Sequence, residues 1–155
     1  MTDPGIGIAG LRTVADFQFG SGAGRALFPE DEQLRIDRSR TGRPRQIHGS
    51  AGRVASFGTD GRFTLGIEGG LRLQDGLEAP AYRVSVDDES EPYVREGKNV
   101  FARFVTGVDD AIRPRDEVLV VHERGELLAV GRAVLDGRSI RAFDRGMAVA
   151  VRESR

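Results

Sequence analysis

The chain of 155 residues is long enough for one domain or two small ones, and its 39% hydrophobic and 30% charged residues are typical of a folded globular protein. The formal net charge of -1 excludes a global basic field, so any site for nucleic acid has to be a local patch. Because cysteine is absent, disulfides, thiolate zinc sites and cysteine nucleophiles are excluded as well.

The sequence also favours a cytoplasmic location. The N-terminal segment has no basic region followed by a long apolar run, so it does not have the pattern of a secretory signal. No apolar stretch approaches the roughly 20 residues that a membrane span requires, and we expect no membrane partner.

The first half of the chain predicts a helix followed by antiparallel strands. Apolar residues recur at helical spacing over residues 11–20, and Gly20 is expected to end that helix. The glycine-rich residues 21–24 predict a flexible turn. The alternation over residues 33–40 predicts a half-buried strand, and residues 45–58 predict a hairpin.

A further strand is expected after the Asp60-Gly61 turn, because Phe63, Leu65 and Ile67 alternate with other residues. Residues 8–76 are therefore predicted to form a small α+β domain with one helix and about four antiparallel strands. The segment 74–81 contains glycine and proline without a regular period, which predicts a linker.

The second half begins with a predicted strand over residues 82–86. Residues 89–97 predict a short helix, with Ser90 as N-cap, Pro92 in the first turn and Gly97 at its end. The alternation in residues 99–105 predicts a strand that continues through this whole segment.

Two continuous apolar runs, Val118–Val121 and Leu127–Val130, flank a predicted turn. Runs of this kind are typical of strands that are buried on both faces, as in a small barrel. Residues 146–152 predict the last strand of the second domain, which we expect to cover residues 81–155.

Catalytic motifs are weak throughout the chain. His48 and His122 are the only histidines, both are expected in exposed turns, and neither has a nucleophile in a known context. The acidic segments 29–32 and 87–91 lack the ligand spacing of a calcium loop. Residues 20–24 lack the lysine of a phosphate-binding loop. We therefore expect no catalytic residues, no metal and no cofactor.

Arginine is concentrated in one part of the first half. The segment from Arg35 to Arg53 contains six arginines and a single acidic residue. Nearly all of the positive charge of the chain is arginine, with Lys98 as its only lysine. Such a patch attracts phosphate, although a solvated hairpin has the same composition. The candidate phosphate contacts within it are Arg38, Arg40, Arg43 and Arg45.

The second half resembles a known RNA-binding module. Residues 96–152 contain the Gly97 turn into "NVFARFV", followed by "IRPRDEVLVV", "LLAVGRAVL" and "RGMAVAVR". These segments, in this order, resemble the PUA domain, which is named for pseudouridine synthases and archaeosine transglycosylases. The resemblance implies a pseudo-β-barrel, so that the whole chain belongs to the α+β class.

The first half resembles the domain that precedes the PUA domain in archaeal archaeosine tRNA-guanine transglycosylases. The similarity is carried by "ADFQFGSGAGRALFP" (15–29), "SRTGRPRQI" (39–47) and "DGRFTLGIEGGLRL" (60–73). The two resemblances cover nearly the whole chain. The family's catalytic barrel, with its aspartate nucleophile and its zinc-binding cysteines, has no counterpart in this sequence.

The resemblance implies a non-catalytic, archaeal RNA-binding protein that contacts structured RNA, above all tRNA, and assists an RNA-modifying enzyme. By resemblance the RNA-facing residues lie on the first helix of the PUA domain, the glycine turn with the strand after it, and the last strand. In this chain they are Arg95, Gly97, Lys98, Asn99, Arg103, Arg145, Gly146 and Arg152.

An alternative function stays open because the net charge is close to zero. The chain could be a protein-interaction subunit of an RNA-modification or ribosome-related complex that makes no RNA contact of its own.

Overall fold

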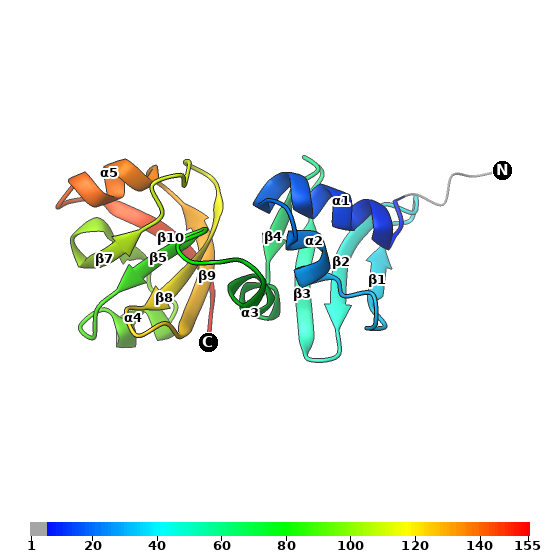
Figure 1. Ribbon diagram of the computed structural model, residues 1–155, viewed down its shortest axis with the longest axis horizontal. Coiled ribbons are helices and arrows are strands. Elements are labelled where there is room, and N and C mark those ends of the chain that lie inside the picture. The colour runs from blue at the N-terminus through cyan, green and yellow to red at the C-terminus, as the bar shows by residue number, and fades with distance from the viewer. Residues whose placement is uncertain (1–5) are drawn as a thin grey trace. The chain divides into compact units, whose positions relative to one another are not determined.

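The computed structural model describes residues 6–155, and the chain divides into two compact units. The N-terminal unit ends at Leu77 and the C-terminal unit begins at Glu78 (Figure 1). Among the described residues no helix is long and apolar enough to cross a membrane.

The N-terminal unit combines helices with a four-stranded antiparallel sheet in the order β1-β2-β3-β4. The predicted helix is α1 and the predicted hairpin is β2–β3, which closes where Gly49 pairs with Gly52. In chain order the elements are α1 (Ile8–Phe19), α2 (Ala23–Leu27), β1 (Arg35–Arg38), β2 (Pro44–Gly49), β3 (Gly52–Phe57), β4 (Phe63–Leu65) and α3 (Ile67–Gly76).

The core of this unit lies between the sheet and its helices. Helix α3 packs on β3 and β4, α2 packs on α3, and α1 packs on α2. The ring of Phe63 lies 5.5 Å from that of Phe28 and 5.1 Å from that of Phe57, measured between centroids. Burial of these aromatic rings is a large apolar contribution to the stability of so small a unit.

Two helices of this unit were not predicted. Residues 21–24, expected to be a flexible turn, contain the start of α2, and Ile67, expected in a strand, is the first residue of α3. A Cβ atom at Gly69 would collide with the carbonyl oxygen of Val54, so glycine allows α3 to lie directly on β3. Gly69 is thus required for close packing of the helix on the strand. In a sequence pattern a glycine usually predicts a turn, which is why α3 was not predicted.

The C-terminal unit is built around a six-stranded sheet in the order β6-β10-β9-β8-β5-β7. All neighbouring strands are antiparallel except β5 and β8, which are parallel. Its elements are β5 (Arg83–Val86), α4 (Glu91–Arg95), β6 (Val100–Phe101), the 3-10 helix η1 (Ala102–Phe104), β7 (Val105–Val108), β8 (Glu117–His122), β9 (Leu127–Ala133), α5 (Gly137–Ala142) and β10 (Met147–Ser154).

The connection between β6 and β7 requires this sheet to close on itself. These strands occupy opposite edges of the sheet, yet only η1 separates them in the chain. The path from Phe101 to Val105 spans at most about 14 Å, whereas the edges of a flat six-stranded sheet lie about 24 Å apart. The sheet therefore curls into a nearly closed barrel, which confirms the predicted α+β class with a pseudo-barrel.

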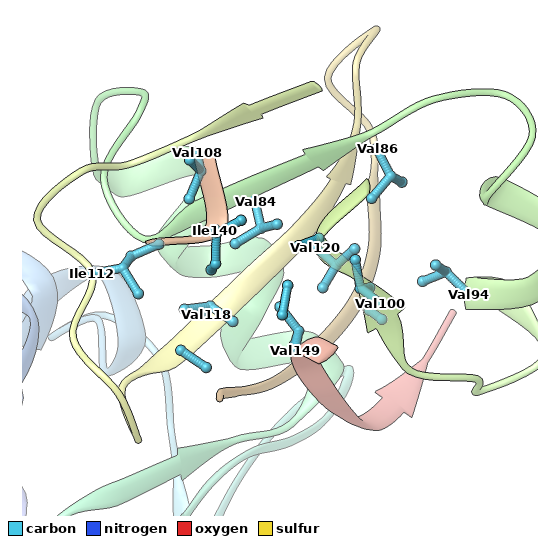
Figure 2. Close-up of a cluster of buried hydrophobic side chains, with 14 of the residues drawn as sticks. Val84, Val86, Val94, Val100, Val108, Ile112, Val118, Val120, Ile140 and Val149 are labelled. Carbon is cyan, nitrogen blue, oxygen red and sulfur yellow. The ribbon is translucent and has the colours of Figure 1, made fainter. Parts of the chain in front are cut away.

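Valine dominates the interior of the barrel. Side chains of Val84 (β5), Val118 and Val120 (both β8) and Val149 (β10) come from three different strands and gather in one cluster (Figure 2). Ile140 of α5 joins the same cluster. Every residue of β8 is buried, as its continuous apolar run predicts.

The predicted strand over residues 99–105 is interrupted. The chain leaves β6 after Phe101 and forms η1, so Ala102 and Phe104 are not part of one alternating strand. Strand β7 and helix α5 were not predicted. Helix α5 is capped by Asp136, whose carboxylate accepts a hydrogen bond from the Ser139 N–H at 3.3 Å.

Candidate nucleic-acid interface

A tight helix end positions the predicted glycine turn. Gly97 has φ +91°, its N–H donates to the Val94 carbonyl at 2.9 Å, and the Lys98 N–H donates to the Tyr93 carbonyl at 3.0 Å. This pair of bonds is a Schellman motif, which favours glycine at the left-handed position. Glycine therefore fixes the direction in which Lys98 and Asn99 leave α4.

Backbone contacts then hold the turn against the last strand. The Asn99 side-chain oxygen accepts a hydrogen bond from the Val151 N–H at 2.9 Å. The Gly146 carbonyl accepts one from the Ala102 N–H at 2.9 Å. Asn99 and Gly146 thus form the frame of the site, because their polar groups bind the protein's own backbone.

A pocket of about 330 Å³ lies beside this turn. Two aromatic side chains in its wall are open to solvent, since Tyr93 is 58% exposed and Phe101 is 46% exposed. The pocket is lined by the end of the β5–α4 loop, α4, the glycine turn, β6 and η1. Its residues are Glu89, Ser90, Tyr93, Val94, Lys98, Asn99, Phe101, Arg103 and Phe104.

A second pocket, of about 290 Å³, shares Phe101 and Arg103 with the first and is completed by Asp144, Arg145 and Gly146. We call the two together the seam pockets, because they lie along β6 and η1, where the chain crosses between the edges of the sheet. The Arg103 guanidinium lies 4.6 Å from the centre of the Phe104 ring, which is a cation–π contact.

The seam pockets bring cations and open aromatic rings together. Within the described residues, the side chains of Lys98 and Arg145 take part in no ion pair or hydrogen bond. Cations of this kind bind phosphate, and exposed aromatic rings stack on unpaired bases. The arrangement is therefore suited chemically to a single-stranded nucleotide segment.

Two of the predicted RNA-facing arginines are engaged elsewhere. Arg95 pairs with Glu126 at 3.1 Å and with Glu91 at 3.6 Å. Arg152 donates to both carboxylate oxygens of Glu117, a residue of β8 that is 4% exposed. These arginines neutralise carboxylates of the fold, and the structure does not bring them into the seam pockets.

His122 is buried, so the expectation of an exposed turn histidine was wrong. Its Nδ1 accepts the Arg124 N–H at 2.9 Å, which places the ring proton on Nε2, and Nε2 lies 2.6 Å from Asp88. This hydrogen bond is the main reason why the pKa of Asp88 is lowered.

A metal site at this histidine is disfavoured by the same geometry. Oxygens of Asp88 and Glu123 lie near enough to His122 to share a cation. A histidine that binds metal through Nε2 carries its proton on Nδ1, where the Arg124 N–H already points. His48, expected in a loop, lies in β2, where its Nε2 is 3.0 Å from Asp37.

The arginine cluster of the N-terminal unit contains two kinds of side chain. Arg38 donates to the Gly42 carbonyl at 2.9 Å, within the turn between β1 and β2. Arg43 donates to the Phe57 carbonyl at 3.2 Å, which ties the start of β2 to the end of β3. Arg40 and Arg45 are exposed, and neither has a side-chain partner among the described residues. Only these two have their full hydrogen-bonding capacity available for a ligand.

The aromatic residues of the site were not predicted. Phe101 alternates with the buried Val100, so an outward-facing ring could have been inferred from the strand pattern. Tyr93 offered no such signal, because α4 is too short for a clear period.

Comparison with known proteins agrees with this architecture. Residues 9–80 match the patch-forming domain C2 of tRNA-guanine transglycosylase, and residues 82–154 match the PUA domain. The chain is therefore a PUA-domain protein with a C2 domain before its barrel. It resembles the C-terminal region of archaeal tRNA-guanine(15) transglycosylases.

The curated relatives are much longer than this chain. It is 49% identical over 143 residues to the tRNA-guanine(15) transglycosylase of Thermococcus kodakarensis, and the match covers 92% of this chain but 24% of that protein. It is 46% identical over 145 residues to the same enzyme of Methanothermobacter thermautotrophicus, with 92% and 22% covered. The chain thus spans about a quarter of these relatives.

Solved structures share the fold at lower identity. A protein from Pyrococcus horikoshii has a TM-score of 0.70 at 21% identity, with 95% of this chain and 89% of that chain covered. A conserved PUA domain protein from Thermoplasma acidophilum has a TM-score of 0.62 at 20% identity, with 92% and 89% covered.

Proposed function

We propose that this chain is a non-catalytic RNA-binding protein that contacts structured RNA, above all tRNA, through the seam pockets. The observation that carries the proposal is the grouping of Lys98, Arg103 and Arg145 with the exposed rings of Tyr93 and Phe101. The relatives are named for the modification of tRNA, which makes tRNA the first RNA to test.

The predicted RNA-binding residues then divide by role. Lys98, Arg103 and Arg145 contact the RNA directly, with phosphate as their first partner because their charges are available. Gly97, Asn99 and Gly146 shape the backbone of the site, whereas Arg95 and Arg152 act through the ion pairs described above. The proposed domains are residues 8–76 and 81–155.

Arg40 and Arg45 form the auxiliary phosphate contact of the proposal. They lie in the β1–β2 hairpin and its turn, and neither has a side-chain partner among the described residues. Both positive charges are therefore available to attract a phosphate group. Arg38 and Arg43 belong to the same cluster, but their contribution to RNA is smaller because their guanidinium groups already bind carbonyls.

The first experiment measures binding of a tRNA transcript by fluorescence anisotropy at low salt. We expect K98A/R103A to weaken binding by about tenfold or more, since a phosphate contact and a stacking cation are lost together. R40Q/R45Q should mainly flatten the salt dependence. R132A removes an exposed arginine outside the pockets and is the control.

Absence of binding to tRNA and to other structured RNA at low salt would overturn the proposal. The proposal treats the seam pockets as the main RNA site and Arg40 and Arg45 as an auxiliary contact. That order is reversed if R40Q/R45Q abolishes binding and K98A/R103A has no effect.

By resemblance we further propose that the protein acts with an RNA-modifying enzyme of the archaeosine pathway. Phe17 on α1 is 91% exposed, so its ring is accessible to a protein partner. An affinity pull-down should retain the enzyme after nuclease treatment, and F17S should release it. If the enzyme is retained only without nuclease treatment, RNA alone connects the two proteins and the proposed protein contact is wrong.

A further inference from the structure

Each seam pocket contains one carboxylate that the protein itself does not use. Glu89 lines the first pocket and Asp144 lines the second. Both are exposed, and in the described part of the chain neither side chain makes an ion pair or hydrogen bond. By contrast, Asp88 and Glu91 beside the first pocket are paired with basic side chains.

An unpaired carboxylate restricts what such a pocket accepts. It repels phosphate, so phosphate is favoured next to the cations and a base is favoured next to the carboxylate. A carboxylate only accepts hydrogen bonds, and the exocyclic amino groups of cytosine, adenine and guanine donate them. Uracil has no amino group, and the N–H on its pairing edge is flanked by two carbonyl oxygens that repel a carboxylate.

The shared wall places two bases next to each other. Phe101 and Arg103 line both pockets, so a base in one pocket and a base in the other lie on either side of these side chains. The exposed ring of Phe101 offers a stacking surface, and Arg103 is available for the phosphate that joins the two nucleotides.

We propose that the seam pockets hold two consecutive unpaired nucleotides, and that Glu89 and Asp144 select bases with an exocyclic amino group over uracil. The inference rests on the proposed RNA-binding function and assigns its base specificity. The cations supply affinity that does not depend on sequence, and the two carboxylates supply the discrimination.

The test uses one RNA hairpin with a two-nucleotide unpaired tail of CC or UU, placed at the 3′ end in one set and at the 5′ end in another. A third tail contains pyrimidin-2-one ribonucleotides, which are cytidine without the amino group. With the full chain, we expect the CC tail at one of the two ends to bind about tenfold more tightly than either the UU or the pyrimidin-2-one tail.

Variants then connect this preference to the carboxylates. A glutamine or asparagine amide both donates and accepts, so E89Q and D144N should each reduce the CC-to-UU affinity ratio, and the double variant should bring it close to one. E96Q removes the same charge from an exposed glutamate at the end of α4, outside both pockets, and should leave the ratio unchanged.

The ratio separates reading of the base from general electrostatics, because loss of a negative charge strengthens binding to every tail alike. Equal affinity of the wild-type chain for all three tails overturns this inference while the proposed function stands. If E96Q reduces the CC-to-UU affinity ratio as much as E89Q does, the inference is also overturned. Failure to bind any of the hairpins or tRNA overturns the proposed function itself.

Discussion

Glu117 shows how one buried charge decides what a nearby arginine does. Its carboxylate is 4% exposed within β8, and Arg152 of β10 binds both of its oxygens. A buried carboxylate without a partner loses its hydration and is strongly destabilising. Arg152 therefore stabilises the barrel first, although its place on the last strand predicted an RNA contact.

We predict that R152A lowers the free energy of unfolding of the C-terminal unit by about 3 kcal/mol, since it leaves Glu117 buried and unpaired. Urea unfolding followed by tyrosine fluorescence measures this, because the chain lacks tryptophan and its two tyrosines, Tyr82 and Tyr93, lie in that unit. The exposed Arg138 of α5 gives the control R138A, with an expected change within about 0.5 kcal/mol. Equal effects of the two substitutions on the free energy of unfolding would contradict the role of Arg152 as the partner of buried Glu117.

At the scale of elements, Arg72 connects three parts of the N-terminal unit. From α3 its guanidinium donates to the Leu27 carbonyl at 2.9 Å and to Glu32 at 2.8 Å, and its Nε donates to Glu68 at 3.1 Å. Glu32 also accepts the Ser50 N–H at 3.0 Å. Helix α3 is thus tied to α2, to the loop before β1 and to the β2–β3 turn.

This network predicts a pH dependence. The hydrogen bond from Arg72, followed by that from Ser50, lowers the pKa of Glu32 in the folded chain below the ordinary glutamate value of 4.5. The contribution of ionised Glu32 to the free energy of unfolding is therefore complete above the ordinary glutamate pKa. This contribution is lost as the pH falls through the lower pKa of Glu32 in the folded chain. We expect E32Q to destabilise by about 2 kcal/mol at pH 7 and by progressively less toward pH 3.

Urea unfolding followed by far-UV circular dichroism measures this difference, and tyrosine fluorescence reports separately on the C-terminal unit. Glu30 is exposed and provides the control E30Q, which should show no pH-dependent difference from wild type. If the E32Q difference stays constant from pH 7 to pH 3, the ionised Glu32 is not what holds α3.

For the whole molecule, charge is balanced globally and concentrated locally. The net charge is -1, yet Lys98, Arg103 and Arg145 lie together in one unit, and Arg40 and Arg45 lie together in the other. On the proposed function, we therefore expect association with RNA to depend on these local groups and on the counterions that phosphate releases when they bind it.

We predict that the logarithm of the tRNA association constant falls with the logarithm of salt concentration with a slope of about -3.5 to -4.5, as five phosphate contacts imply. Titrations between 50 and 300 mM salt, a range of about sixfold, suffice to measure it. R40Q/R45Q should reduce the magnitude of the slope by about 2. A wild-type slope steeper than about -7 would mean that further arginines contact the RNA.

Elements whose signals are local could be predicted from the sequence. The apolar runs within β8 and β9, the hairpin of β2 and β3 and the glycine turn at Gly97 follow from patterns within a few residues. The order of the segments that resemble the PUA domain is also a property of the sequence, and it predicted the barrel and the region of the proposed site.

Which charged side chains are available to a ligand depends on contacts between distant segments. Arg95 meets Glu126 at a separation of 31 residues, and Arg152 meets Glu117 at a separation of 35. The seam pockets likewise exist because β6 and β7 lie at opposite edges of a sheet that closes. Pairing and closure depend on contacts between distant segments, and burial sets their energies, so no local pattern of residue types contains them.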